Sequence, residues 1–340
     1  MSDELPHVFD LDRLYFVDFA KTYARIYGTF AVFIMHPGMM YLIWTKSPYM
    51  ERNFKIASVL QQISLMLSDI WQCFAFTIYV LTPVPALICN GFLCSTGVPG
   101  TLLMVFETFF TVNAAAWYIF LILNMHQKIV GYQTKWWRNS YSMSIALTSI
   151  LLITVCGFIV FGKESTNAYI EKQKPYLEWT SKYPKLILYG TIGNLQNFKY
   201  TLIFFGCSCA AFIPFVPVIA VYSIRSLNSF SLNNDKTKQA QKRTMRILLA
   251  QISNASIFYI MPLGVLFSTM VIYIPLPDVA FAFVRFIEIS LFTIHPLPTT
   301  IILYLKTPAH RKTVALAIRE LIERGKSLFF GTAAPTFPWN

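Results

Sequence analysis

Seven long apolar runs constrain this chain more than any other feature of its sequence. A run of 26 residues, such as the last one, forms a helix about 39 Å long, which crosses a hydrocarbon layer of about 30 Å with some tilt. The runs cover residues 24–45, 56–80, 99–124, 141–162, 200–224, 247–274 and 280–305. We therefore expect an all-α membrane protein, a seven-transmembrane helix bundle over 24–305. An N-terminal segment, 1–23, precedes it, and a tail, 306–340, with a short amphipathic helix follows it.

Composition supports the membrane class and argues against a nucleic-acid-binding protein. Hydrophobic residues make up 55% of the chain and charged residues only 13%, whereas soluble domains carry about 25% charge. The formal charge of +12 comes from bases that lie in short clusters between the apolar runs, which is the pattern of cytoplasmic loops. We expect the lipid bilayer as a partner and no nucleic acid.

Basic residues are unevenly shared between the two sets of loops. The loops 46–55, 125–138 and 225–246 and the tail together hold 18 Lys and Arg, whereas the N-terminal segment and the remaining loops hold 8. Cytoplasmic loops carry the excess of Lys and Arg in membrane proteins. The asymmetry predicts an extracellular N-terminus and a cytosolic C-terminus.

Three ionisable residues in the third and seventh runs are candidates for a ligand site. A charge buried alone in lipid is costly, and an opposite charge removes much of that cost. We expect Glu107 and Arg285 to approach each other across the two helices, with Glu288, one turn below Arg285, as the alternative partner. Two interpretations stay open: an ion pair that is purely structural, and a pair that also lines a ligand cavity.

Four further positions in the apolar runs are candidates for a switch or hinge. Asp69, in the second run, is either a neutral acid bonded to Ser64, Ser68 or a neighbouring helix, or a polar switch that reorganises when the bundle changes shape. Both interpretations place it facing inward. A proline inside a helix frees backbone carbonyls and leaves a kink. We therefore expect bends at Pro262 and at His295-Pro296.

The cysteine spacing and the lack of catalytic motifs argue against a metal site and against an enzyme. The six cysteines show no metal-ligand spacing, and Cys89 and Cys94 are close enough in sequence for a local disulfide, which stays open. The sequence contains no HExxH or GxSxG pattern. We expect neither a cofactor nor an enzyme.

Four segments carry a family resemblance. They are SLMLSDI (64–70), TPVPALICNGFLC (82–94), NMHQKIV (124–130) and HPLPTTIILYLKTPAHRKTV (295–314). In this order they resemble the nematode serpentine chemoreceptors, seven-transmembrane G-protein-coupled receptors, particularly class I and the related class H. The rhodopsin-like signatures, an acid-Arg-aromatic triplet after the third run and Asn-Pro-x-x-Tyr in the seventh, are absent.

The resemblance implies a chemosensory receptor for odorants or pheromones in the plasma membrane of sensory-neuron cilia. It implies a small-molecule ligand within the bundle and a heterotrimeric G protein as partner. The expected G-protein contacts lie in the basic loops and are His126, Lys128, Lys242, Arg243 and Arg246. Read without the resemblance, the same bases are topological charge attracted to anionic lipid. A multi-pass transporter or channel is the alternative function, although the chain has no internal repeat.

Overall fold

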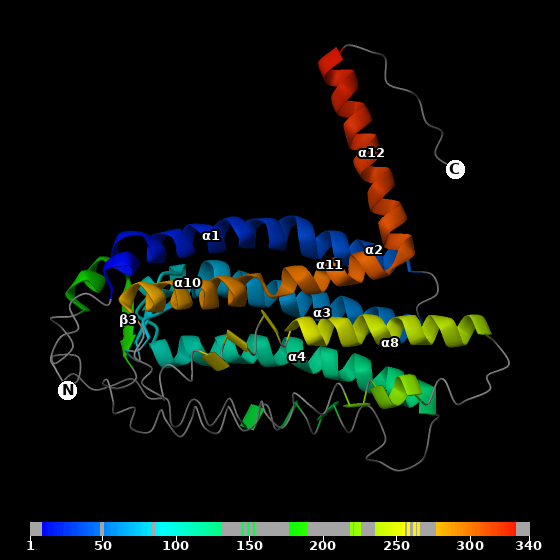
Figure 1. The fold of residues 1–340 in the computed structure, drawn as a ribbon, viewed down its shortest axis with the longest axis horizontal. Helices are drawn as coiled ribbons and strands as arrows, with labels where there is room; N and C mark the ends of the chain where they lie inside the picture. Colours follow the sequence, from blue (N-terminus) through cyan, green and yellow to red (C-terminus); the bar gives the residue numbers. More distant parts are fainter. Residues whose placement is uncertain are drawn as a thin grey trace.

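The structure is a computed structural model of the 340-residue chain. The described residues are 9–47, 51–130 except 83 and 85, 144–145, 148–149, 152–153, 177–188, 218–219, 221–225, 235–255, 257–258, 261–262, 264–265 and 277–330. Most of the predicted helices 141–162 and 200–224, and nearly half of the predicted helix 247–274, therefore lie outside the described residues. In the described part of the chain, the long helices lie side by side along one direction (Figure 1).

The first helical rod is longer than its apolar run. It joins η1 (Asp12–Phe16), α1 (Val17–Phe30), η2 (Ala31–Met35) and α2 (His36–Thr45) without a break. Pro37 lies in the first turn of α2. Because proline cannot donate a backbone hydrogen bond and crowds the carbonyl four residues earlier, a wide π-type turn just before it lets the helix continue.

Further long helices follow among the described residues. They are α3 (Arg52–Ile70) with η3 (Trp71–Ala75), α4 (Gly100–Val130), α8 (Asp235–Ala255), α10 (Asp278–Ile294), α11 (Pro296–Lys306) and α12 (Pro308–Phe330). Helix α3 packs against α4, and α8 packs against α11. Helix α12 projects away from the bundle (Figure 1).

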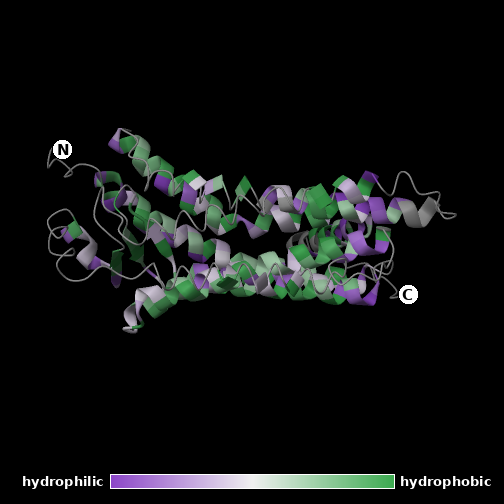
Figure 2. Cartoon of the chain, turned by 90° about the horizontal axis from the view of Figure 1, so that it is seen from below, coloured by the Kyte–Doolittle hydropathy of each residue, from purple (hydrophilic) through white to green (hydrophobic). Residues whose placement is uncertain are grey.

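Two continuous helices among the described residues are long and apolar enough to cross a membrane, Asp12–Thr45 and Gly100–Ile129. The pair α10 and α11 passes the same test as one span that bends by 46°. Hydrophobic residues cover the middle of the long helices, and hydrophilic ones gather toward both ends of the bundle (Figure 2). This distribution fits helices whose middle parts face hydrocarbon.

A small antiparallel sheet closes one end of the bundle, which we call the sheet end. Its strands are β1 (Ile78–Val80), β2 (Ala86–Cys89) and β3 (Lys185–Leu188), with β2 in the centre. Cys89 pairs with Ile78 on one side and with Lys185 on the other. The opposite end, where α12 begins, is called the tail end.

The sheet is a departure from the predicted all-α class. The helix expected over 56–80 ends at Ala75, and Ile78–Val80 is extended, because β-branched and aromatic residues there favour a strand. The largest buried apolar cluster forms around these strands. Gly91 allows the close packing, since a Cβ at this position would lie 2.0 Å from the carbonyl oxygen of Ala75.

Candidate functional site

Arg285 is the centre of a buried charge cluster at the sheet end. Its guanidinium donates from Nε to Asp12 Oδ1 at 3.1 Å and from Nη2 to Asp12 Oδ2, while Nη1 donates to the carbonyl of Thr82. The Tyr79 hydroxyl donates to Asp12 Oδ1 at 2.5 Å. Arg285 and Asp12 are both 0% exposed. The cluster therefore ties the first helix, α10 and the segment beside the sheet together with charge-assisted bonds.

The predicted ion pair between Glu107 and Arg285 is wrong. Gln72, in the wide turn η3, donates from Nε2 to Glu107 Oε1 at 2.6 Å. The second oxygen of Glu107 is buried and accepts no hydrogen bond. The reason is that Arg285 satisfies its charge with Asp12, an acid that the sequence pattern placed in the polar N-terminal segment.

An aromatic group lies beside the Glu107–Gln72 pair. The ring centroid of Trp71 lies 5.4 Å from those of Phe106 and of Phe110. The indole nitrogen of Trp71 and the amide oxygen of Gln72 are buried without a hydrogen-bond partner. Together, Trp71, Gln72 and Glu107 have one hydrogen-bond donor and two acceptors that bond to nothing within the described part of the protein. This is unusual, because buried polar groups are normally hydrogen-bonded.

Glu288 is a second buried acid without a partner. It lies one turn beyond Arg285 on α10 and is 6% exposed, and neither carboxylate oxygen forms a hydrogen bond. It is therefore not the alternative hydrogen-bond partner of Arg285 that the spacing suggested. Among the described residues, three acids have buried oxygens that accept no hydrogen bond: Asp69, Glu107 and Glu288.

Asp69 faces inward, as predicted, and bonds to the first helical rod. Its Oδ2 lies 2.8 Å from His36 Nε2 and 3.4 Å from the Tyr27 hydroxyl, and His36 Nδ1 lies 3.1 Å from Gln62 Oε1. His36, Gln62 and Asp69 are all 0% exposed. The neighbouring helix, rather than Ser64 or Ser68, supplies the partners of this acid.

The predicted break at His295-Pro296 is present. Helix α10 ends at Ile294, α11 begins at Pro296, and the two helices are bent by 46°. His295 is buried, and its Nδ1 lies 2.9 Å from the carbonyl oxygen of Phe292, a carbonyl near the break. Pro262 is buried in a short described helical piece, and a bend there lies outside the described residues.

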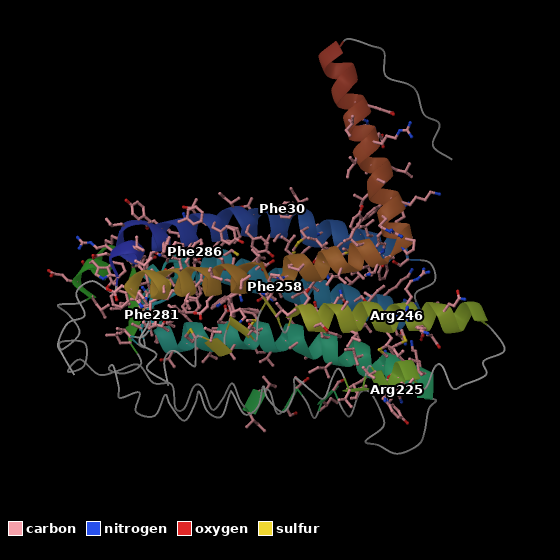
Figure 3. The ribbon with its side chains drawn as sticks, viewed as in Figure 1. Phe30, Arg225, Arg246, Phe258, Phe281 and Phe286 are labelled. Carbon is pink, nitrogen blue, oxygen red and sulfur yellow. A yellow bond between two sulfur atoms is a disulfide. The ribbon has the colours of Figure 1, made fainter. Side chains whose placement is uncertain are left out.

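Two of the expected G-protein contacts bond to neighbouring segments at the tail end. His126 Nδ1 lies 2.7 Å from the hydroxyl of Ser223, and Lys128 pairs with Glu51 at the start of α3. The other three, Lys242, Arg243 and Arg246, lie on α8. Arg225 and Arg246 lie at this end, whereas Phe281 and Phe286 lie toward the sheet end (Figure 3).

The start of α12 is bonded to the segment just after the first helical rod by one buried histidine. His310 is 0% exposed, and its Nε2 lies 2.8 Å from the hydroxyl of Ser47. Burial lowers the pKa of His310 below its ordinary value. The tail helix is therefore attached through a neutral ring at neutral pH.

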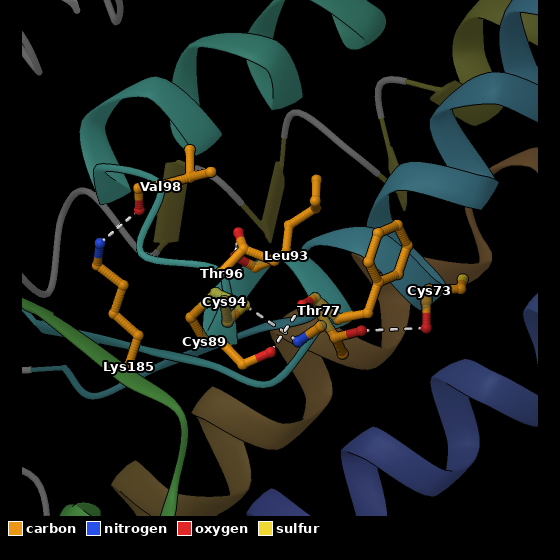
Figure 4. Close-up of a disulfide and its surroundings, with 11 residues drawn as sticks. Cys73, Thr77, Cys89, Leu93, Cys94, Thr96, Val98 and Lys185 are labelled. Carbon is orange, nitrogen blue, oxygen red and sulfur yellow. Dashed lines mark hydrogen bonds between the residues drawn. A yellow bond between two sulfur atoms is a disulfide. The ribbon is translucent and has the colours of Figure 1, made fainter.

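Cys89 and Cys94 form a disulfide at the sheet end (Figure 4). The backbone amide of Gly91, inside this loop, donates to Cys94 Sγ at 3.1 Å. Lys185 of β3 donates to the carbonyl of Val98 at 2.6 Å. The bridge and this bond hold the segment before α4 against the sheet.

Sequence reasoning missed Asp12 and His36. A signal for Asp12 was present, since the buried positions Val17, Ala20 and Ala24 repeat every three or four residues and extend the inward face of the first helix toward the N-terminus. His36 stood inside an apolar run next to Pro37, but its partner lies 33 residues away, so its role had no local signal.

Helices long enough to cross a membrane, with ionisable groups buried between them, define a multi-pass membrane helix bundle. The family model described as "Serpentine type 7TM GPCR chemoreceptor Srh" matches residues 17–319. The chain belongs to this family of seven-transmembrane G-protein-coupled chemoreceptors. The predicted resemblance to nematode serpentine chemoreceptors is confirmed. No curated protein matches the chain.

Proposed function

We propose that this membrane receptor binds an odorant or pheromone within its helix bundle and signals to a heterotrimeric G protein. Family membership supports this function. We further propose seven spans with an extracellular N-terminus and a cytosolic C-terminus, in the plasma membrane of sensory-neuron cilia. In this orientation the sheet end faces outward and the tail end faces the cytosol.

The unused polar groups beside Glu107 are the observation that carries the ligand proposal. Glu107 Oε2, Gln72 Oε1 and Trp71 Nε1 are buried and without hydrogen-bond partners, and the rings of Phe106 and Phe110 lie beside that of Trp71. A ligand that supplies hydrogen-bond donors, above all a protonated amine, would satisfy the two acceptors and contact the aromatic faces. Glu288 is the second proposed ligand contact, whereas Arg285 serves the bundle through Asp12.

Signal transfer would pass through the buried elements between the two ends. The His36–Asp69 pair joins the first rod to α3, and the bend at His295-Pro296 divides the seventh span. A ligand changes a two-state equilibrium only by binding one state more tightly. We propose that ligand binding shifts these elements. Pro262 is proposed as a further hinge, and His126, Lys128, Lys242, Arg243 and Arg246 as the surface that meets the G protein.

The test is ligand-dependent nucleotide exchange on a Gα subunit, with membranes that contain the receptor and a panel of aliphatic and aromatic amines. Matched alcohols and carboxylic acids serve as chemical controls. Glu107→Gln should weaken the response to an active amine by roughly 10- to 100-fold, since a hydrogen bond to a charged group contributes about 1.5–3 kcal/mol. Glu178→Gln, at an exposed acid near the sheet, should leave it unchanged.

Two results would contradict the proposal. An undiminished amine response in Glu107→Gln would remove this acid from the ligand site. Substrate flux through the purified protein in liposomes without a G protein, together with no nucleotide exchange, would favour the transporter or channel alternative.

A further inference from the structure

A cavity of about 520 Å³ lies at the tail end, between α8 and the end of α11. Four bases line it: Lys242, Arg243, Arg246 and Lys306. Its size lies within the range of small-molecule sites in proteins, about 300–1,000 Å³. The cavity is separate from the group around Glu107, which belongs to η3 and α4.

The α8 residues of this cavity lie on one face of the helix. Gln239, Lys242, Arg243 and Arg246 follow each other at spacings of three, one and three, and Ile247 and Ala250 continue the pattern. The face is therefore polar and basic near the start of α8 and apolar farther along. A ligand that fits this cavity carries negative charge at one end and an apolar part at the other.

Three of the bases in the cavity, Arg243, Arg246 and Lys306, have no acidic partner in the part of the chain that the structure describes. Among the described residues, no acid lines the cavity and no carboxylate forms an ion pair with Arg243, Arg246 or Lys306. By contrast, Arg319 and Arg324 on α12 each pair with a Glu four residues away. Like charges gathered around one cavity repel each other, and an anion with several charges would relieve that repulsion.

We propose that this cavity binds the phosphorylated headgroup of an anionic membrane lipid, with a phosphoinositide as the best chemical fit. Arg243 and Arg246 offer planar guanidinium groups that bind phosphate oxygens in pairs, and Lys306 adds a point charge from the second helix. The apolar end at Ile247 and Ala250 suits the start of the acyl chains and favours a lipid over a free phosphate.

The lipid would bridge two helices that pack against each other at the tail end. Helix α8 begins before the sixth apolar run and continues into it, and α11 is the second half of the bent seventh span. A bound headgroup would therefore hold α8 and α11 at a fixed distance. The inference rests on the proposed function only for the orientation that places the tail end at the cytosolic leaflet, where anionic lipids attract basic segments.

The experiment uses the purified full-length receptor in neutral detergent and a fluorescent short-chain phosphatidylinositol bisphosphate, with binding read by anisotropy. Arg243→Gln/Arg246→Gln should weaken binding by at least tenfold. Arg319→Gln/Arg324→Gln removes the same charge from exposed positions on α12 and should leave binding unchanged. Thermal unfolding of each variant shows that the fold is retained, which is expected because Arg243 and Arg246 are exposed.

Three further arms identify the source of the phosphate. Soluble inositol trisphosphate, phosphatidylserine and phosphatidylcholine compete against the labelled lipid. The proposal requires that unlabelled phosphatidylinositol bisphosphate competes best. Equal competition by the free headgroup would overturn the lipid assignment, and equal weakening by both double variants would reduce the effect to net charge. Because the assay contains neither odorant nor G protein, its failure and the failure of the proposed receptor function are distinguishable.

Discussion

The ion pair between Asp12 and Arg285 gives the sharpest prediction about stability. Both side chains are 0% exposed, and Arg285 meets Asp12 through two of its nitrogens. Asp12→Ala would remove two of the bonds that the guanidinium makes and the negative charge beside it, and would free the hydroxyl of Tyr79. The penalty arises because a buried charge without its partner keeps the full cost of desolvation.

The expected size follows from these contacts. Removing one partner of a buried ion pair costs about 3–5 kcal/mol, so we expect Asp12→Ala to destabilise the receptor by about 4 kcal/mol. At a few degrees per kcal/mol, the unfolding temperature should fall by roughly 10 °C. Tyr79→Phe removes one hydrogen bond to a charged acceptor, and its cost should be about 1.5–3 kcal/mol.

The assay is thermal unfolding of the purified receptor in detergent, and Asp18 provides the control on the same helical rod. Asp18 pairs with Lys182 at 3.4 Å, and both side chains are about half exposed. Such pairs contribute about 0–1 kcal/mol, so Asp18→Ala should change the unfolding temperature little. The comparison separates the effect of burial from the loss of an acid.

A double-mutant cycle tests the coupling directly. Asp12→Leu/Arg285→Met replaces both charges by apolar groups and should recover at least about 2 kcal/mol relative to the sum of the single changes. The reasoning is refuted if the single costs simply add in the double variant. It is also refuted if Asp12→Ala costs no more than Asp18→Ala.

Two further predictions concern the packing of the first rod and the attachment of the tail. Gly28→Ala should destabilise the receptor by about 1–3 kcal/mol in thermal unfolding, since a Cβ there would lie 2.4 Å from the Cβ of Cys73. Gly38→Ala is the control: a Cβ at this position meets nothing within 4 Å, so the change should be neutral or slightly stabilising. Burial lowers the pKa of His310 from its ordinary 6.5, so its attachment to Ser47 should be complete above about pH 6.5 and weaken as the pH falls through the lowered value. Hydrogen exchange of α12 should rise over this pH interval, and His310→Asn should abolish the pH dependence; an unchanged pH profile in that variant would exclude the histidine as its cause.

The sequence predicted correctly those structural features that depend on a residue and its immediate neighbours. The 46° bend at His295-Pro296 follows from the chemistry of proline, which lacks the backbone donor and crowds the preceding turn. The inward orientation of Asp69 follows from the cost of placing an acid against lipid. Both features depend on a residue and its immediate surroundings, so they could be predicted without a partner.

The sequence could not predict which residues on different helices bond to each other. Periodicity shows which face of a helix points inward, but not which residue of another helix meets it. Glu107 and Arg285 looked complementary by charge and depth, yet Arg285 meets Asp12, 273 residues away in the chain. The first helix begins near Asp12, about three turns before the predicted start of its apolar run at residue 24, and this brings the acid into the bundle.

The sequence by itself determined the membrane class, the break in the seventh span and the receptor family, because apolar length, proline and ordered motifs are properties of short segments. Only the tertiary structure decided that Asp12 neutralises Arg285 and that the basic face of α8 meets Lys306 around a cavity. The physical reason is that a buried charge takes the partner that helix packing brings within bonding distance, and packing depends on the whole bundle.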